Sequence, residues 1–271
     1  MSGDDLSGEL GRLLAGIVES EVGGSPDVGL LLSGGVDSLS VGFAAESVGK
    51  RVSAYTFKVE GIPSRDAFSA ERAARAFGWK FRLVEVPVGA VRQDFLRLIG
   101  MGCRKKTEVE CLWPFLYLVP EIAESHVLSG MWADGHFGLS KRAMIHHRAT
   151  VEEFDRFRVS YFASVPQRAL FRGLCSHNNK VWVAPYDRDP IRDLFLGSSW
   201  DALNKPIQKA PIVRAYRDRF RLVGRRRHEN LQLVAGIPSV FRRLLEDTTL
   251  NKRGRTRMMD LVRDVSSEAT L

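Results

Sequence analysis

The sequence has 271 residues, of which 44% are hydrophobic, and its 40 lysine and arginine residues exceed its 32 aspartate and glutamate residues by eight charges. This length suits one large α/β domain, or a domain with an extension, around a single core. No apolar run approaches the ~20 residues that a membrane span needs, and the acidic start lacks the order of a signal peptide, so we expect a cytoplasmic protein. Three cysteines without metal-type spacing predict reduced thiols.

The first elements predict a phosphate-binding turn. Residues 10–22 have the spacing of an amphipathic helix, residues 28–32 form an apolar strand, and residues 40–48 continue a helix. Between strand and helix lies Ser33-Gly34-Gly35-Val36-Asp37-Ser38. Adjacent glycines let the backbone approach a ligand closely, and a helix N-terminus attracts anions. The serine hydroxyls add donors, whereas Asp37 beside a phosphate suggests a ligand for the Mg²⁺ that accompanies ATP.

This turn lacks the lysine of a Walker sequence and resembles the PP-loop of the N-type ATP pyrophosphatases. The resemblance implies cleavage of ATP between its α- and β-phosphates, with adenylation of a carbonyl or carboxylate oxygen. It assigns nucleotide contacts to Ser33, Gly34, Gly35, Asp37 and Ser38.

Strands and helices then alternate. We expect strands at 51–59, 81–86 and 126–129, helices at 65–77, 89–99 and 111–123, and a loop at 101–110. This alternation predicts a doubly wound, mainly parallel sheet of the PP-loop ATP pyrophosphatase (adenine nucleotide α-hydrolase-like) type, with ATP at the carboxyl ends of the strands. The expected domains are a core at 1–150, a mainly helical completion at 151–250, and a solvated basic tail at 251–271.

A second glycine turn follows the strand at 126–129. It reads Ser129-Gly130-Met131-Trp132-Ala133-Asp134-Gly135-His136-Phe137-Gly138 and resembles the synthetase domain of the asparagine synthetase family, whose loop is typically Ser/Thr-Gly-Glu-Gly-x-Asp-Glu-x-Phe-Gly. The resemblance places Ser129 and Gly130 beside the nucleotide and has Asp134 share Mg²⁺ with Asp37. It also places Leu31 and Phe57 around the adenine.

Departures from the family pattern bear on the substrate. Met131 and Gly135 replace two glutamates, so acidic groups on the substrate side are lost. Amidotransferase members begin with a glutaminase domain whose catalytic cysteine comes first, whereas this sequence has Ser2 there and no room for that domain. The expected nitrogen source is therefore ammonia, a substrate amine, or a separate glutaminase subunit.

A late cation is a further family feature. Relatives place a lysine in an Arg-x-Lys context, and the matching segment here puts His228 in that position, with Arg226 as a fixed charge nearby. The alternative reading is that His228 belongs to an exposed basic run. Lys205 and Lys209 are alternative cations, although a lysine that opens a helix is usually solvated.

The leading hypothesis is an ATP-dependent ligase that adenylates a small-molecule carboxylate, releases AMP and pyrophosphate, and joins the activated acid to an amine or ammonia. Two alternatives stay open: a PP-loop enzyme that modifies a nucleobase or nucleic acid, which the basic charge would suit, and an ATP-binding module that has lost catalysis. Sulfur transfer by the former would need Cys103 or Cys111 near the nucleotide.

Overall fold

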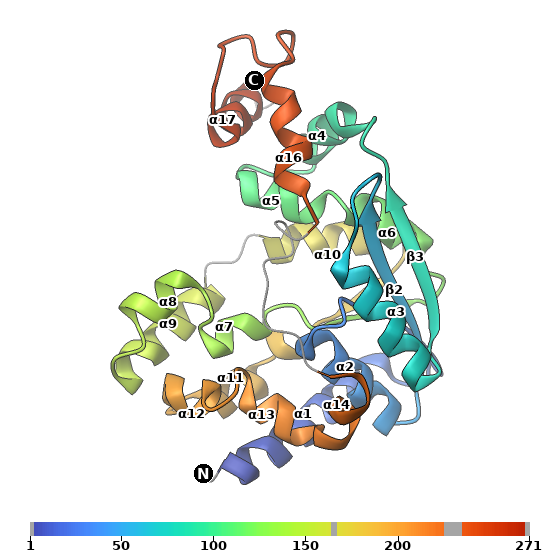
Figure 1. Ribbon diagram of the computed structural model, residues 1–271, viewed down its shortest axis with the longest axis vertical. Coiled ribbons are helices and arrows are strands. Elements are labelled where there is room, and N and C mark those ends of the chain that lie inside the picture. The colour runs from blue at the N-terminus through green and yellow to red at the C-terminus, as the bar shows by residue number, and fades with distance from the viewer. Residues whose placement is uncertain (1–2, 164–166, 225–234, 269–271) are drawn as a thin grey trace.

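The computed structural model describes residues 3–163, 167–224 and 235–268 (Figure 1). Within them one sheet has the strand order β3-β2-β1-β4-β5, and each neighbouring pair is parallel. The strands are β1 (Asp27–Leu31), β2 (Arg51–Val59), β3 (Lys80–Val86), β4 (His126–Ser129) and β5 (Val181–Val183). The chain adds β2 and β3 on one side of β1 and then β4 and β5 on its other side. This order confirms the doubly wound sheet. The switch point lies between β1 and β4, where such sheets bind ligands.

Helices cover both faces of this sheet. In the first half they are α1 (Gly3–Val22), α2 (Val36–Ser47), α3 (Arg65–Phe77), α4 (Val91–Gly100), α5 (Lys106–Leu112), α6 (Phe115–Leu118), α7 (Ala133–Phe137) and α8 (Lys141–His146). In the second half they are α9 (Val151–Ala163), α10 (Gln167–His177), α11 (Asp189–Phe195), α12 (Trp200–Asn204), α13 (Ala210–Ala215), α14 (Arg217–Val223), α16 (Ile237–Arg242) and α17 (Met258–Glu268). Short 3₁₀ turns occupy Val119–Glu121, Pro185–Asp187 and Arg243–Leu245.

Two apolar cores lie on opposite faces of the sheet. Successive residues of β1 point to different cores: Leu30 joins the core that α1 and α2 cover, whereas Leu31 joins the core beneath α4, α5 and α17. Both cores are needed because parallel strands with helices on each side bury both of their faces. Figure 1 shows α1, α13 and α14 at one end of the molecule and α4, α5, α16 and α17 at the other.

The predicted helix at 65–77 is confirmed as α3, and local chemistry explains its limits. Ser64 caps its start by accepting a hydrogen bond from the backbone N of Ala67 at 3.1 Å. Gly78 ends it with a left-handed φ of 68°, which glycine adopts without steric cost.

The sequence interpretation missed two elements. The segment expected as a loop at 101–110 contains the start of α5, and the half expected to be mainly helical contains β5, which pairs with β4. Strand β5 has only three residues, so its alternation was too short to detect. It is nevertheless the edge strand that supports the second glycine turn.

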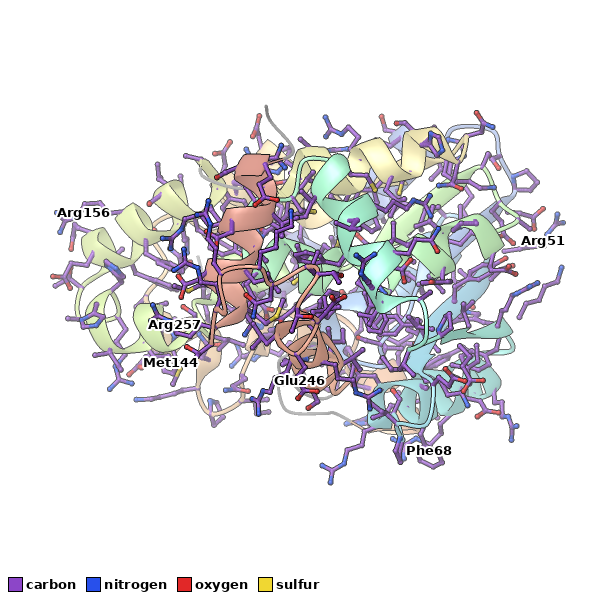
Figure 2. The ribbon with its side chains drawn as sticks, turned by 90° about the horizontal axis from the view of Figure 1, so that it is seen from above. Arg51, Phe68, Met144, Arg156, Glu246 and Arg257 are labelled. Atoms are coloured by element: carbon purple, nitrogen blue, oxygen red, sulfur yellow. The ribbon has the colours of Figure 1, made fainter. Side chains whose placement is uncertain are left out.

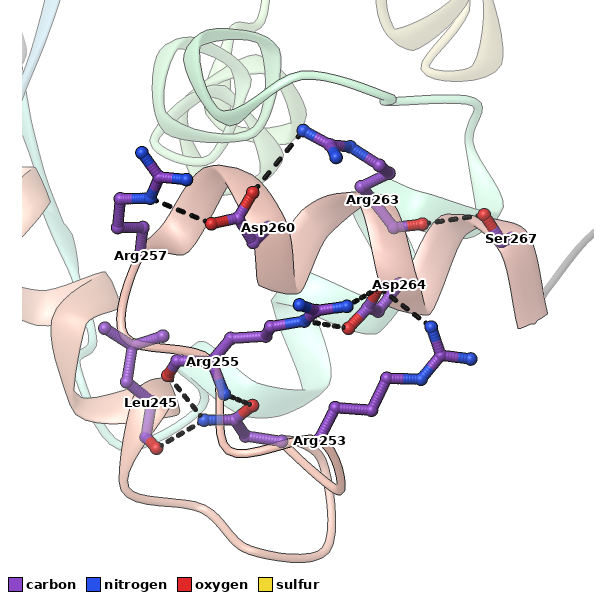
Figure 3. Close-up of polar contacts among 9 residues, drawn as sticks. Leu245, Arg253, Arg255, Arg257, Asp260, Arg263, Asp264 and Ser267 are labelled. Carbon is purple, nitrogen blue, oxygen red and sulfur yellow. Dashed lines mark hydrogen bonds and ion pairs between the residues drawn. The ribbon is translucent and has the colours of Figure 1, made fainter.

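The basic tail expected after residue 250 is solvated only in part: the side chains of Arg253, Arg255 and Arg257 are 61%, 39% and 71% exposed, whereas the residues after them form a packed helix. Helix α17 buries Met258, Leu261 and Val262 against α4 and α5. Figure 3 shows how acidic residues neutralise the arginines of this segment: Asp264 accepts from Arg255 at 2.6 Å and from Arg253 at 3.2 Å. The remaining division into domains, at residues 150 and 250, stays a prediction.

The helices that follow the second glycine turn project away from the sheet. Figure 2 labels Met144 of α8 and Arg156 of α9 at the end of the molecule opposite Arg51, the first residue of β2. None of the helices in the described ranges is both long and apolar enough to cross a membrane.

Candidate functional site

The first glycine turn joins β1 to α2 in a geometry that only glycine allows at one point. Gly34 has a φ of 73°, and a Cβ there would lie 2.6 Å from the Cβ of Ser69 and 2.7 Å from its carbonyl carbon. The turn therefore packs directly on α3. Its shape leaves the N-terminus of α2 at the carboxyl end of the sheet, where the free N–H groups favour an anion.

The two serines of this turn brace it from within. The hydroxyl oxygens of Ser33 and Ser38 lie 3.2 Å apart, and the hydroxyl of Ser33 accepts a hydrogen bond from the backbone N of Gly35 at 3.2 Å. Ser38 accepts from the backbone N of Ser33 at 3.3 Å and donates to the carbonyl of Gly35 at 3.1 Å. These contacts fix the loop without a ligand, so the serines are structural as well as potential donors.

The second glycine turn lies against the first. A Cβ on Gly130 would come within 2.5 Å of the carbonyl carbon of Asp37 and 2.6 Å of the backbone N of Ser38. Because β1 and β4 are adjacent parallel strands, both turns emerge at the same edge of the sheet. The indole N–H of Trp182 in β5 donates to the hydroxyl of Ser129 at 2.9 Å and holds the second turn in place.

Asp37 and Asp134 converge, as the sequence predicted, but a lysine lies between them. The ammonium of Lys209 contacts the Asp37 carboxylate and lies 2.6 Å from the Asp134 carboxylate. Only 3% of the Lys209 side chain is exposed. Burial alone would lower the pKa of Lys209, but the charges and hydrogen bonds of Asp134 and Asp37 together outweigh it and raise the pKa above its ordinary value. Lys209 is therefore a buried permanent cation.

The backbone of Lys209 is also held firmly. Its φ is 58° at the start of α13, and its N–H donates to the side-chain oxygen of Asn204 at 3.3 Å. The amide nitrogen of Asn204 donates to the carbonyl of Phe137 at 2.9 Å. This chain of contacts fixes Lys209 relative to the helix that carries Asp134.

These groups line one cavity of about 1140 Å³ at the carboxyl end of the sheet. The predicted site residues that line it are Leu31, Ser33, Gly35, Asp37, Ser38, Phe57, Ser129, Gly130 and Asp134. Gly34 faces α3 and does not line the cavity, while His228 and Arg226 fall outside the described residues. The volume exceeds the ~300–1,000 Å³ of a typical single-ligand pocket, so the cavity has room for a nucleotide and a second molecule.

The donor set fits Mg-ATP. Mg²⁺ is commonly held by one or two carboxylates together with phosphate oxygens and water, and Asp37 and Asp134 face one point beside the N-terminus of α2. Within the described ranges, no three His, Cys, Asp or Glu side chains gather into a metal site. An ion held by Asp37 and Asp134 would take further ligands from phosphate oxygens and water.

The wall beside Phe57 is aromatic. The ring centroid of Phe57 lies 5.9 Å from that of Phe115, which lies 4.9 Å from that of Phe171, and both contacts are edge-to-face. All three rings line the cavity. This wall offers an apolar surface for a flat base next to the backbone of Leu31.

Gly135 replaces the second glutamate of the family pattern, and Tyr161 fills the space beside it. A Cβ on Gly135 would lie 2.3 Å from the ring of Tyr161, so Tyr161 occupies the space that a larger side chain would need. Burial, followed by the charge of Asp134, raises the pKa of Tyr161 to about 12. A neutral phenol thus stands beside Asp134 where the family pattern has an acid.

Trp132 has an unusual backbone. Its φ is 74°, and the only other non-glycine residues with positive φ in the described ranges are Lys209 and Asn179. Asparagine tolerates this region, whereas a tryptophan there is strained at a cost of about 1–3 kcal/mol. Trp132 and Lys209 line the cavity. Backbone strain of this kind tends to concentrate at functional sites.

A model of the asparagine synthase family matches residues 9–258, almost the whole chain. The chain belongs to this family. No curated protein matches it.

Among solved structures, the chain is similar to one from Methanocaldococcus jannaschii described as a predicted subunit of tRNA methyltransferase. The identity is 17%, the match covers 77% of this chain and 95% of that chain, and the TM-score is 0.32.

Sequence reasoning missed the burial of Lys209 in this asparagine synthase family member. Lys209 lies 172 positions after Asp37, and no local pattern links the two. The sequence offered Lys209 only as an alternative cation, because a lysine that opens a helix is usually solvated. Tyr161 was not singled out, because its part in the site depends on the space left by Gly135.

Proposed function

We propose that this protein is an ATP-dependent, AMP-forming carbon–nitrogen ligase. The observation that supports the proposal most strongly is the convergence of Asp37 and Asp134, from two glycine turns on adjacent strands, on one buried cation at the floor of the cavity. Bound Mg-ATP would supply the adenylyl group: a carboxylate oxygen attacks the α-phosphate, the bond to the β-phosphate breaks, and pyrophosphate leaves with an acyl adenylate as the product.

Asp37 and Asp134 would hold Mg²⁺, and the turn at Ser33, Gly34 and Gly35 with Ser38 would hold the pyrophosphate. The N-terminus of α2 adds its N–H groups. The packing of Gly130 on Asp37 and Ser38 fixes the distance between the two turns. Fixed donors of this kind stabilise charge on a leaving group without reorganisation at the moment of reaction.

Lys209 would act as the fixed positive charge next to the phosphates. Its pKa is raised, so it carries its charge at every physiological pH and can contact the phosphate and the two carboxylates. The sequence assigned this role to His228 with Arg226, and that assignment remains a proposal.

The adenine would lie against the backbones of Leu31, Ser129 and Gly130, beside Phe57. The remaining volume would receive a small-molecule carboxylate, and the amine that attacks the activated acid would come from ammonia, from an amine substrate, or from a separate glutaminase subunit. The product is an amide or a related C–N bond.

The test is pyrophosphate release by purified protein with Mg-ATP, with carboxylic acids and ammonia as stimulants. Asp37→Asn and Asp134→Asn should each lower the rate at least about 100-fold, because each removes a charge from the ion-binding point. Asp201→Asn, at an exposed surface ion pair with Lys205, is the matched control and should leave the rate unchanged. Equal rates in all variants would refute the proposal.

The nucleobase-modifying alternative has one structural observation in its favour. Cys111 lines the cavity, as a sulfur-transferring enzyme would require. Cys103 does not fit that role, because burial raises the pKa of its thiol to about 12. If Cys111→Ser abolished pyrophosphate release in the presence of RNA and left it unchanged with acids, the alternative would replace the ligase.

A further inference from the structure

Trp132 stands where the family pattern has a glycine. The backbone there has a φ of 74°, which suits glycine and disfavours a bulky side chain. The chain therefore keeps the glycine backbone and adds an indole ring to it. A side chain held against the preference of its own backbone, in the wall of a cavity, points to a contact made by that side chain.

The indole ring is fixed on two sides. The ring of Tyr161 meets it edge-to-face at 6.5 Å between centroids, and the guanidinium of Arg168 lies 5.6 Å from its centroid. Arg168 is itself held by Asp187, at 2.6 Å. Trp132 therefore presents a rigid aromatic surface to the cavity, as does Tyr161.

The indole N–H of Trp132 is buried, and no hydrogen-bond acceptor lies within reach of it among the described residues. A buried indole N–H usually finds a partner. Trp182 of β5 shows the ordinary case, because its N–H donates to the hydroxyl of Ser129. An oxygen of a bound molecule would satisfy the Trp132 donor.

Positions 131 and 135 of the second turn offer no acid to a cationic acceptor, because Met131 and Gly135 bring no carboxylate. Of the acids that line the cavity in the described ranges, Asp37 and Asp134 contact Lys209, Glu108 accepts from the backbone N of Arg104 and Lys105, and Asp66 lies in the first turn of α3. An ammonium group on the acceptor would find no acid at the positions where the family pattern has glutamates. Leu170 and Ile207 add apolar side chains to the same cavity.

We propose that Trp132 and Tyr161 form the acceptor subsite, and that the acceptor is an aromatic carboxylic acid without an α-ammonium group. Its ring packs against the indole and phenol, and one of its oxygens accepts the Trp132 N–H. This inference rests on the proposed ligase function, because it names the acid that is adenylated. Trp132 is thus a specificity-determining residue.

Binding is measured by calorimetry with Mg²⁺, a non-cleavable α,β-methylene ATP analogue, and either 3-phenylpropionate or L-aspartate as probe. The wild type should bind 3-phenylpropionate at least about tenfold more tightly than aspartate. Trp132→Gly should weaken that binding about fivefold to tenfold, the range of one aromatic contact. Asn179→Gly makes the same backbone change outside the cavity and should not alter binding.

Trp132→Phe keeps one aromatic ring on the same backbone and removes the N–H together with part of the indole surface, so it tests the subsite even if Trp132→Gly fails to fold. It should weaken binding by a smaller factor. Tighter binding of aspartate by the wild type, or equal binding of 3-phenylpropionate by all variants, would overturn the inference. If the protein bound 3-phenylpropionate selectively but released no pyrophosphate, the ligase function would be contradicted and the aromatic subsite would remain supported. If only aspartate stimulated pyrophosphate release, the ligase function would be supported and the aromatic subsite contradicted.

Discussion

Lys209 shows how one residue can combine structure and chemistry. Its ammonium is buried between two carboxylates, and a buried charge is tolerable only when it is paired and hydrogen-bonded. The carboxylates of Asp37 and Asp134 also need the lysine, because two negative charges that both contact one ammonium lie close together and repel each other. Lys209 therefore occupies the position of a counter-ion that a metal could share or replace.

This arrangement predicts that Mg²⁺ stabilises a variant without the lysine. Lys209→Met should lower the free energy of unfolding by about 3–5 kcal/mol, because it leaves two carboxylates side by side without a cation. Added MgCl₂ should raise the melting temperature of this variant more than that of the wild type. The measurement is thermal unfolding in a series of Mg²⁺ concentrations.

Lys205→Met is the matched control, since Lys205 pairs with Asp201 on the surface and such pairs contribute less than about 1 kcal/mol. If Mg²⁺ raised all three melting temperatures equally, Asp37 and Asp134 would not form an ion-binding point.

The cysteines provide a second test at this scale. Burial raises the pKa of both Cys103 and Cys175 to about 12, so both remain protonated thiols in the folded protein. Cys111 is partly exposed and lines the cavity. At pH 8, Ellman's reagent should modify Cys111 alone in the native state, and saturating Mg-ATP should slow that reaction.

Cys111→Ser should remove the native reaction entirely, and denaturation should release the two buried thiols. Because the two raised pKa values favour the thiol form in the folded state, their contribution to stability should be lost as the pH rises from about 9 toward 12. Rapid native modification of more than one thiol would contradict the buried positions.

At the scale of elements, the contact between the two glycine turns sets the site. Gly130→Ala would place a Cβ within 2.5 Å of the backbone of Asp37. We expect a loss of about 1–3 kcal/mol of stability from the forced separation, together with slower pyrophosphate release. The measurement is urea unfolding, paired with the release assay.

Gly173→Ala supplies the comparison. Gly173 lies inside α10, and a Cβ there would meet no atom within 4 Å. Alanine should therefore stabilise the protein by about 0.5–1 kcal/mol and leave pyrophosphate release unchanged. Equal effects of the two substitutions would mean that the turns do not pack as described.

Helix α17 gives a further test of an element. Leu261 is 1% exposed and belongs to the second core, whereas its neighbour Met259 is 50% exposed. Leu261→Ala should lower the free energy of unfolding by about 2–5 kcal/mol, and Met259→Ala by no more than about 0.5 kcal/mol. Chemical denaturation followed by circular dichroism measures both; similar small values would restore the solvated tail.

The elements that the sequence predicted are those with local signals. The strand and helix around Ser33 and Asp37, and the helix of residues 65–77, follow from turns, caps and apolar periodicity. Strand β5 was missed because three residues carry no periodicity, and α17 because arginines outside it, at 253, 255 and 257, masked its apolar face. Their neutralising partners Asp260 and Asp264 lie in the helix itself.

At the scale of the whole molecule, the two cores unite residues from both halves of the chain. The cavity has the same origin: β1, β2 and β4 contribute its floor from the first half, whereas α9, α10 and the start of α13 contribute Tyr161, Leu170 and Lys209 from the second. The two glycine turns of the cavity could be predicted from two short motifs. The wall that Tyr161 and Leu170 form could not, because its residues meet only in the folded chain.

The proposed ligase function requires that the site adenylates a carboxylate. The direct measurement is incubation with Mg-ATP, ammonia and 3-phenylpropionate labelled with ¹⁸O in both carboxylate oxygens, followed by mass spectrometry of the nucleotide product. Adenylation predicts AMP that carries one ¹⁸O atom, because the attacking oxygen stays on the α-phosphate when the amide forms. Unlabelled AMP, or ADP with inorganic phosphate, would contradict the claim.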